Sequence, residues 1–173
     1  MQETAEQYRK RMLGYSDGKD PLKMQAAAPA GLAKLLKGVS AATARKRPAP
    51  EKWSIGEIVA HMSDAELVVG YRVRAILGQP GTAIMGYDQD VWVKALHYEK
   101  RELKKSYEQY RALREANVAL LKRLAPEQFK HVGLHSERGP ESVGTILRMM
   151  AGHDLNHFEQ IERILAAGKK KKK

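Results

Sequence analysis

Four long segments of the chain carry apolar residues at three- and four-residue spacing, and this pattern constrains the fold more than any other feature of the sequence. The segments cover residues 22–39, 54–77, 101–124 and 141–167. A spacing close to the 3.6-residue period of the α-helix gives each segment one apolar face, and no stretch of convincing length alternates as a β-strand does. The sequence therefore predicts an all-α fold, a four-helix bundle of the up-and-down type.

Local signals mark where some of these helices begin and end. Ser54 is a typical N-cap residue, Glu57 three positions later completes a capping box, and Trp53 is placed to pack onto the first turns of the helix. Gly168 is expected to close the last helix, because glycine is common just beyond a helix C-terminus.

The length and composition favour a single domain. With 173 residues, 43% of them hydrophobic, the chain can bury one well-formed core. Two further segments, 3–15 and 89–96, are predicted as short extra helices. We expect an N-terminal helical extension at residues 1–19, the bundle at residues 20–168 and a disordered lysine tail at residues 169–173.

The segment 152–161 places His153 and His157 four residues apart within the apolar stripe of the last helix. Residues at positions i and i+4 lie on one face of a helix, so both imidazoles are expected to point inward and to converge. His61 occupies an aliphatic position in the stripe of the second long helix. Its depth in that helix allows the three rings to reach one level of the bundle.

Three neutral imidazoles are suitable ligands for a divalent cation such as Zn, Ni or Fe, with positions left open for water or substrate. The sequence therefore predicts that His61, His153 and His157 form a metal site. The alternative reading of each histidine is a core residue whose ring is hydrogen-bonded. The residues after His153 do not form the HExxH signature, so a peptidase of that class is not expected.

The remaining histidines and the acidic residues near the stripes give weaker signals. His131 and His135 are also four residues apart, but glycine and proline break their segment, and His97 is expected at a helix boundary. The carboxylates near the stripes are expected to be solvated or capping, with support of a ligand ring as the alternative. The carboxylates in question are Asp64, Glu66, Asp88, Asp90 and Asp154. Tyr87 and Trp92 are expected to pack in the core, with an overhang at the open end of the bundle as the alternative.

The charge and the absence of cysteine restrict the class of protein. The formal net charge is +11, but five lysines at the C-terminus contribute much of it, and without them 26 basic residues face 20 acidic ones. The other basic residues are interleaved with acidic ones, as on a solvated helix face, so no specific nucleic-acid partner is expected. No segment reads as a signal peptide or a membrane span. We expect a soluble cytoplasmic protein with no membrane partner and no disulfide.

Two segments resemble the signature helices of the DinB-like superfamily of four-helix-bundle proteins. They are residues 51–66, around Trp53 and His61, and residues 149–161, around His153 and His157. The similarity covers residues 20–167, including the connection 87–92. The resemblance implies that the same three histidines bind a divalent metal. It also implies a metal-dependent activity, because some relatives are transferases or isomerases that activate a low-molecular-weight thiol.

These observations lead to two functional hypotheses. The first is a metal-dependent transferase or hydrolase that acts on a small-molecule substrate, with the metal lowering the pKa of a bound thiol or water. The second is a non-catalytic metal-binding or dimerisation bundle, in which the three histidines brace the bundle. A second copy of the chain, forming a homodimer, is a candidate partner under either hypothesis. An open coordination position beside a pocket would favour the enzyme, and a closed site would favour the brace.

Overall fold

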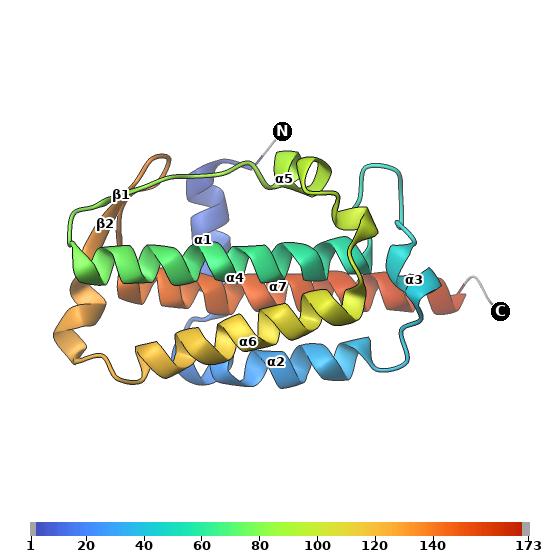
Figure 1. Ribbon diagram of the computed structural model, residues 1–173, viewed down its shortest axis with the longest axis horizontal. Coiled ribbons are helices and arrows are strands. Elements are labelled where there is room, and N and C mark those ends of the chain that lie inside the picture. The colour runs from blue at the N-terminus through green and yellow to red at the C-terminus, as the bar shows by residue number, and fades with distance from the viewer. Residues whose placement is uncertain (1–2, 171–173) are drawn as a thin grey trace.

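The protein folds around a four-helix bundle, as the apolar periodicity predicts. The computed structural model describes residues 3–170. The bundle consists of α2 (Pro21–Leu36), α4 (Ile55–Gly78), α6 (Leu103–Leu121) and α7 (Val143–Lys170) (Figure 1). Helix α4 packs on α6 and α7, and α2 packs on the same two helices, so α2 and α4 lie diagonally opposite each other.

The order of helix directions differs from the simple up-and-down bundle that the sequence predicts. In Figure 1, α4 and α6 run in one direction, whereas α2 and α7 run in the other. Consecutive helices α4 and α6 are parallel because the connection between them returns along the length of α4 before α6 begins. This connection carries β1 (Ala83–Ile84), α5 (Gln89–Ala95) and the short 3-10 helix η1 (Tyr98–Lys100).

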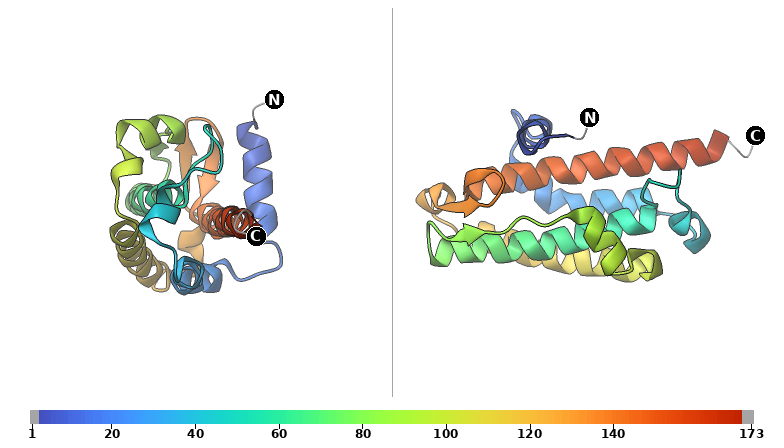
Figure 2. Two further views of the ribbon diagram at one scale, coloured as in Figure 1. Left: turned by 90° about the vertical axis from the view of Figure 1, so that its right-hand side faces the viewer. Right: turned by 90° about the horizontal axis from the view of Figure 1, so that it is seen from above.

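Helix α1 (Ala5–Tyr15) lies outside the bundle and crosses over α7 (Figure 2). Its Met12 side chain is fully buried. The crossing depends on Gly152, because a Cβ atom at this position would collide with the backbone carbonyl of Met12. The remaining short elements are α3 (Ala41–Arg45) and the 3-10 helix η2 (Pro126–Lys130).

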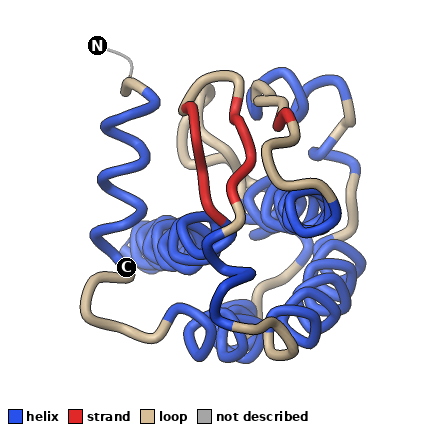
Figure 3. The backbone as a smooth tube through the Cα atoms, turned by 90° about the vertical axis from the view of Figure 1, so that its left-hand side faces the viewer, coloured by secondary structure: helices blue, strands red, loops and turns tan. Residues whose placement is uncertain are grey.

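A small three-stranded sheet lies at the end of the bundle where α7 begins (Figure 3). Strand β2 (Val132–His135) pairs antiparallel with β3 (Gly139–Ser142) and parallel with β1. Gly139 has φ +70°, a backbone conformation that glycine adopts without strain, at the start of β3. The sequence pattern did not predict these strands, because segments of two to four residues are too short to show an alternation.

The predicted start of α4 is confirmed, whereas the predicted end of α7 is wrong. Ser54 and Glu57 form the predicted capping box at the start of α4. Gly168 does not close α7, which continues to Lys170. The first two residues of the predicted lysine tail are therefore helical, and residues 171–173 lie outside the described part of the chain. Within that part, no helix is long and apolar enough to cross a lipid bilayer.

The core is divided along the bundle axis into two apolar clusters with a polar layer between them. The cluster near the sheet includes Ile76, Leu121 and Val143, and the cluster near α3 includes Ile58 and Ile161. Between the two clusters, α4, α6 and α7 bury polar and charged side chains. The largest of these side chains are Glu66, Arg114, Asp154 and the three predicted metal ligands.

Candidate metal centre

The three histidines that the sequence singles out meet inside the polar layer. Nε2 of His153 lies 3.0 Å from Nε2 of His61 and 3.1 Å from Nε2 of His157. One nitrogen from each ring lies within 4.8 Å of the other two, and within residues 3–170 this is the only such group of three or more His, Cys, Asp or Glu side chains. The three rings are buried, with 2%, 6% and 6% of their residues' surfaces exposed.

Two helices bring these rings together. His61 lies in the second turn of α4, downstream of the capping box, and the other two lie on one face of α7, on either side of its midpoint. The antiparallel packing of α4 against α7 places them at one level (Figure 1). The site therefore lies at the middle of α7 and close to the N-terminal end of α4.

Neighbouring side chains fix the rings of the triad. Nδ1 of His157 lies 2.9 Å from the Gln160 side-chain oxygen, which can only accept, so Nδ1 carries the proton and the Nε2 lone pair faces the other two rings. The indole of Trp53 packs against His61, with ring centroids 5.0 Å apart, and stacks at 6.5 Å on His157. Nδ1 of His153 is buried without a hydrogen-bond partner among the described residues.

Burial keeps the three imidazoles neutral. It lowers the pKa of His61 and of His153 well below 6.5, and the nearby His157 ring lowers both further. Burial also lowers the pKa of His157, to about 4, even though Gln160 opposes the shift. Neutral imidazole is the form that binds metal ions.

The arrangement fits a divalent cation. Two unprotonated ring nitrogens cannot form a hydrogen bond with each other, because neither has a proton to donate. A cation, by contrast, can accept a lone pair from each of the three ring nitrogens. A tetrahedral ion with nitrogen ligands at about 2.0–2.1 Å would hold those nitrogens about 3.4 Å apart, close to the spacing of the triad. The neutral, buried set of three nitrogens suits Zn, Ni or Fe.

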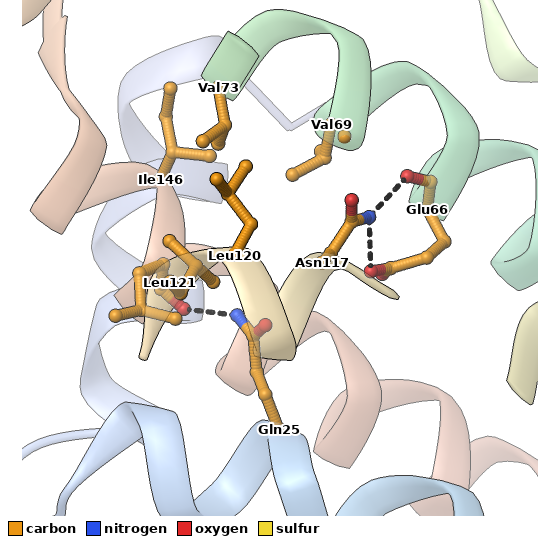
Figure 4. Close-up of a pocket in the computed structure, with 10 residues that line it drawn as sticks. Gln25, Glu66, Val69, Val73, Asn117, Leu120, Leu121 and Ile146 are labelled. Atoms are coloured by element: carbon orange, nitrogen blue, oxygen red, sulfur yellow. Dashed lines mark hydrogen bonds between the residues drawn. The ribbon is translucent and has the colours of Figure 1, made fainter. Parts of the chain in front are cut away.

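An ion network lies beside the triad in the polar layer. Arg114 on α6 is fully buried and donates to Asp154 on α7, at 2.5 and 3.1 Å, and to Glu66 on α4, at 2.7 Å. Tyr110 also donates to Asp154. Asn117 donates to Glu66, as Figure 4 shows. The prediction that Glu66 and Asp154 are solvated or capping is therefore wrong. Both carboxylates connect the helices that carry the triad.

The three other carboxylates have separate roles. Asp64 is also buried, contrary to the prediction, and accepts hydrogen bonds from Tyr98 and Arg101. Asp88 caps α5, as a capping carboxylate was expected to do. Asp90 accepts a hydrogen bond from the Trp53 indole at 3.1 Å, so it supports the ring that packs on His61.

A cavity of about 660 Å³ opens beside the triad. His61 and His153 form part of its wall, and α1 contributes Tyr8. On the side of α5, the wall includes Tyr87, whose ring packs against Trp92 with centroids 4.3 Å apart. Both aromatic residues are partly exposed, so the expectation that they pack in the core is wrong, and Tyr87 takes the overhanging position that was its alternative.

The other predicted histidines do not join the triad. Neither His131 nor His135 lies on a helix, because His131 precedes β2 and His135 is the last residue of that strand. His135 Nδ1 accepts a hydrogen bond from the backbone N–H of Glu137. His97 is at a boundary between short helices, as predicted. Arg72, a buried arginine on the cavity wall, was not predicted as a site residue, although its place in the apolar stripe of α4 was a detectable signal.

Comparisons with known proteins identify some that are similar to this chain in sequence and one that is similar in fold. A protein of Oceanobacillus iheyensis named "Putative metal-dependent hydrolase" is 25% identical over 115 residues, which are 66% of this chain and 65% of that protein. A protein of the same name from Halalkalibacterium halodurans is 22% identical over 113 residues, 65% of this chain and 66% of that protein. The chain thus spans slightly less than two thirds of these curated relatives.

The fold is similar to a solved structure described as "YfiT from Bacillus subtilis is a probable metal-dependent hydrolase with an unusual four-helix bundle topology". The TM-score is 0.81, and the match covers 96% of this chain and 90% of that one, at 18% sequence identity. The sequence model of the DinB superfamily matches residues 26–161, which include the three histidines, all of α4 and α6 and most of α2 and α7. The chain therefore belongs to the DinB superfamily.

Proposed function

We propose that the protein is a metal-dependent hydrolase that acts on a small-molecule substrate, with His61, His153 and His157 as the metal ligands. The observation that carries this proposal is that His61 and His153 lie on the wall of the 660 Å³ cavity. Three protein ligands beside a cavity of this size are typical of catalytic metal sites, which leave a position for water or substrate. The names of the two curated relatives support the same reaction class.

The residues around the triad have distinct tasks in this proposal. When bound, a divalent cation would lower the pKa of water and so supply a nucleophile near neutral pH. Gln160 keeps the Nε2 lone pair of His157 free, and Trp53 covers the rings of His61 and His157 on one side. Asp90 holds the Trp53 indole in that position.

A structural brace is the competing function, and the cavity argues against it. A closed structural site surrounds its ion with four protein ligands, whereas no fourth His, Cys, Asp or Glu joins the triad among residues 3–170. The buried Arg114 network already connects α4, α6 and α7 without a metal. We also propose that the protein acts in the cytoplasm, with residues 20–168 as the metal-binding unit and α1 as an extension that completes the cavity wall.

Metal analysis of the purified protein, followed by hydrolysis assays, tests the proposal. We expect about one divalent ion per chain and metal-dependent cleavage within a panel of small esters, amides and lactones. His61→Ala with His157→Ala should remove both the metal and the activity, while His131→Ala, outside the triad, should keep both. Full metal occupancy in the double variant would contradict the ligand assignment.

A second set of assays separates hydrolysis from group transfer and from a brace. The metal-loaded protein is assayed with an electrophilic small molecule, with and without a low-molecular-weight thiol. Turnover that requires the thiol would show a transferase. Bound metal with no turnover in either assay would favour the brace.

A further inference from the structure

Two arginines are buried in the part of the chain that the structure describes, and their surroundings differ. Arg114 is fully buried between the carboxylates of Asp154 and Glu66. Arg72 on α4 is 8% exposed, and no carboxylate of residues 3–170 lies within ion-pair distance of it. Its guanidinium Nη2 donates to the backbone carbonyl of Met85. A buried charge that lacks a counter-ion is costly, so a cation in this position calls for a functional explanation.

The free N–H groups of Arg72 face the cavity of the metal centre. Arg72 belongs to the same cavity wall as His61 and His153. Its nitrogens are not among the buried polar atoms without a partner, whereas Nε of the enclosed Arg114 is. Solvent in the cavity therefore reaches the guanidinium. The Tyr87 ring, 5.9 Å from the Arg72 Cζ atom, lies on the cavity wall beside it.

Most other charged groups on this wall are already engaged. Arg138 is paired with Glu141, with Nε and Oε1 2.6 Å apart. Asp88 caps α5, and Asp90 accepts from Trp53.

The two remaining acidic residues of the wall do not neutralise Arg72. Glu3 is paired with Arg11 at 2.8 Å. Glu137 is exposed to solvent and lies beyond ion-pair distance of Arg72. Arg72 is thus the buried cation of the cavity that is left without a counter-ion.

We propose that Arg72 binds an oxyanion, the carboxylate or phosphate group of a substrate whose other end reaches the histidine triad. This inference rests on the proposed function and specifies its substrate class. Arg72 follows His61 by roughly three helical turns, a rise of about 16 Å, and helical side chains lean toward the N-terminus of their helix. The guanidinium therefore reaches back toward the triad, so a small molecule can contact both. A planar guanidinium with several free N–H groups matches either oxyanion.

The first experiment uses the metal-free protein, so that it does not depend on the proposed function. Thermal unfolding is followed in sodium phosphate, in sodium acetate and in sodium chloride of equal ionic strength. We expect phosphate or acetate to raise the unfolding midpoint by a few degrees more than chloride does, because the folded state alone binds the anion. The better anion identifies whether the group is a phosphate or a carboxylate.

Three variants make this experiment specific to Arg72. Arg72→Gln should lose the extra stabilisation. Arg72→Lys keeps the charge and should retain part of the stabilisation, and it provides the test if the glutamine variant folds poorly. Arg123→Gln, the same change at an exposed position on another face, should behave as the unchanged protein. An equal anion effect in the unchanged protein and in both Arg72 variants would overturn the proposal.

The second experiment asks whether the anion site and the triad bind one molecule. Cobalt(II)-substituted protein is titrated with ω-mercaptocarboxylates, and with ω-mercaptoalcohols of the same length, over spacers of two to eight methylenes. Binding is followed by the thiolate-to-cobalt absorption band. At one spacer length the acid should bind about tenfold more tightly than the alcohol, as expected of a charge-assisted hydrogen bond. This preference should vanish in Arg72→Gln, while the alcohol binds as before.

The two experiments distinguish failure of the inference from failure of the proposed function. If the protein binds no cobalt, the proposed function fails, while the anion effect in the metal-free protein still tests Arg72. If thiolates bind cobalt but acids and alcohols bind equally at every length, the assigned substrate class is wrong and the metal site stands.

Discussion

Gln160 lies one helical turn beyond His157, and its side-chain oxygen accepts the proton of His157 Nδ1 at 2.9 Å. This contact selects the tautomer in which Nε2 faces the other two imidazoles. We predict that Gln160→Met weakens metal affinity by about 10–100-fold, because the ring loses both its orientation and its acceptor. Competition with a chromophoric chelator would measure the change. Gln79→Met, at the exposed end of α4, is the matched control, and equal affinity in the two variants would contradict the role of Gln160.

Removal of the metal should leave the bundle folded. The two apolar clusters are built mainly from α2, α4, α6 and α7 without any contribution from the triad, unlike small zinc modules whose folding depends on their ion. Circular dichroism of the protein after dialysis against a chelator should therefore retain its helical signal. Loss of that signal would mean that the ion is structural and would favour the brace.

The metal-free protein should lose stability as the pH falls from about 6.5 toward 4. In the unfolded chain the three imidazoles bind protons near pH 6.5, whereas burial lowers the pKa of each in the folded state, that of His157 to about 4. Between these values the unfolded state binds more protons, so acid favours unfolding by about 1.4 kcal/mol per pH unit for each imidazole. Above about pH 6.5 the three imidazoles are neutral in both the folded and the unfolded chain, so this loss of stability is absent.

Urea unfolding at pH 7.5, 6.0 and 5.0 would measure this loss of stability. His153→Leu should show a shallower pH dependence than the unchanged protein, because one of the three buried imidazoles is absent. A pH dependence that is identical in His153→Leu would show that the triad is not its source.

Arg114→Met should destabilise the protein by about 3–5 kcal/mol, because it leaves the buried carboxylates of Glu66 and Asp154 without their counter-ion. Arg111→Met removes an exposed arginine one turn away on α6, whose partner is Glu115, and should cost less than about 1 kcal/mol. Chemical denaturation of both variants would measure the difference. Adding Glu66→Gln and Asp154→Asn to Arg114→Met should recover part of the loss, and no recovery would indicate that packing is the main contribution of Arg114.

Gly152→Ala should displace α1, because the added methyl group would meet the Met12 carbonyl. We expect a loss of about 1–3 kcal/mol, as for other overpacked sites, and faster proteolysis between α1 and α2. Gly168→Ala places the same methyl group in open space near the end of α7 and should be neutral or slightly stabilising. Equal protease resistance in the two variants would show that the α1 crossing tolerates a side chain.

The sequence predicts those features that depend on neighbours along one helix. The capping box of Ser54 and Glu57 and the shared face of His153 and His157 follow from fixed spacings of three and four residues. The meeting of His61 with that pair required only that two apolar stripes face each other. These parts of the candidate site could therefore be identified before the structure was known.

The features that the sequence did not predict depend on partners far away in the chain. Glu66 and Asp154 resemble ordinary helical carboxylates until Arg114, on a third helix, is placed between them. The parallel direction of α4 and α6 depends on the path of their connection, which has no periodic signature. The two- to four-residue strands are stabilised by pairing between residues 83–84 and 132–142, which no local pattern reveals.

Helix α1 carries a part of the cavity wall that lies outside the segment matched by the superfamily model, residues 26–161. The histidines lie inside that segment, and a single close approach at Gly152 allows α1 to lie against the helix that holds two of them. In the proposed function, the molecule thus separates the part that would hold the ion from a part that shapes the space above it. Substitutions in α1 such as Tyr8→Ala should then alter which molecules enter without disturbing the proposed ligands, so the N-terminal helix is the place where we expect specificity to be changed most readily.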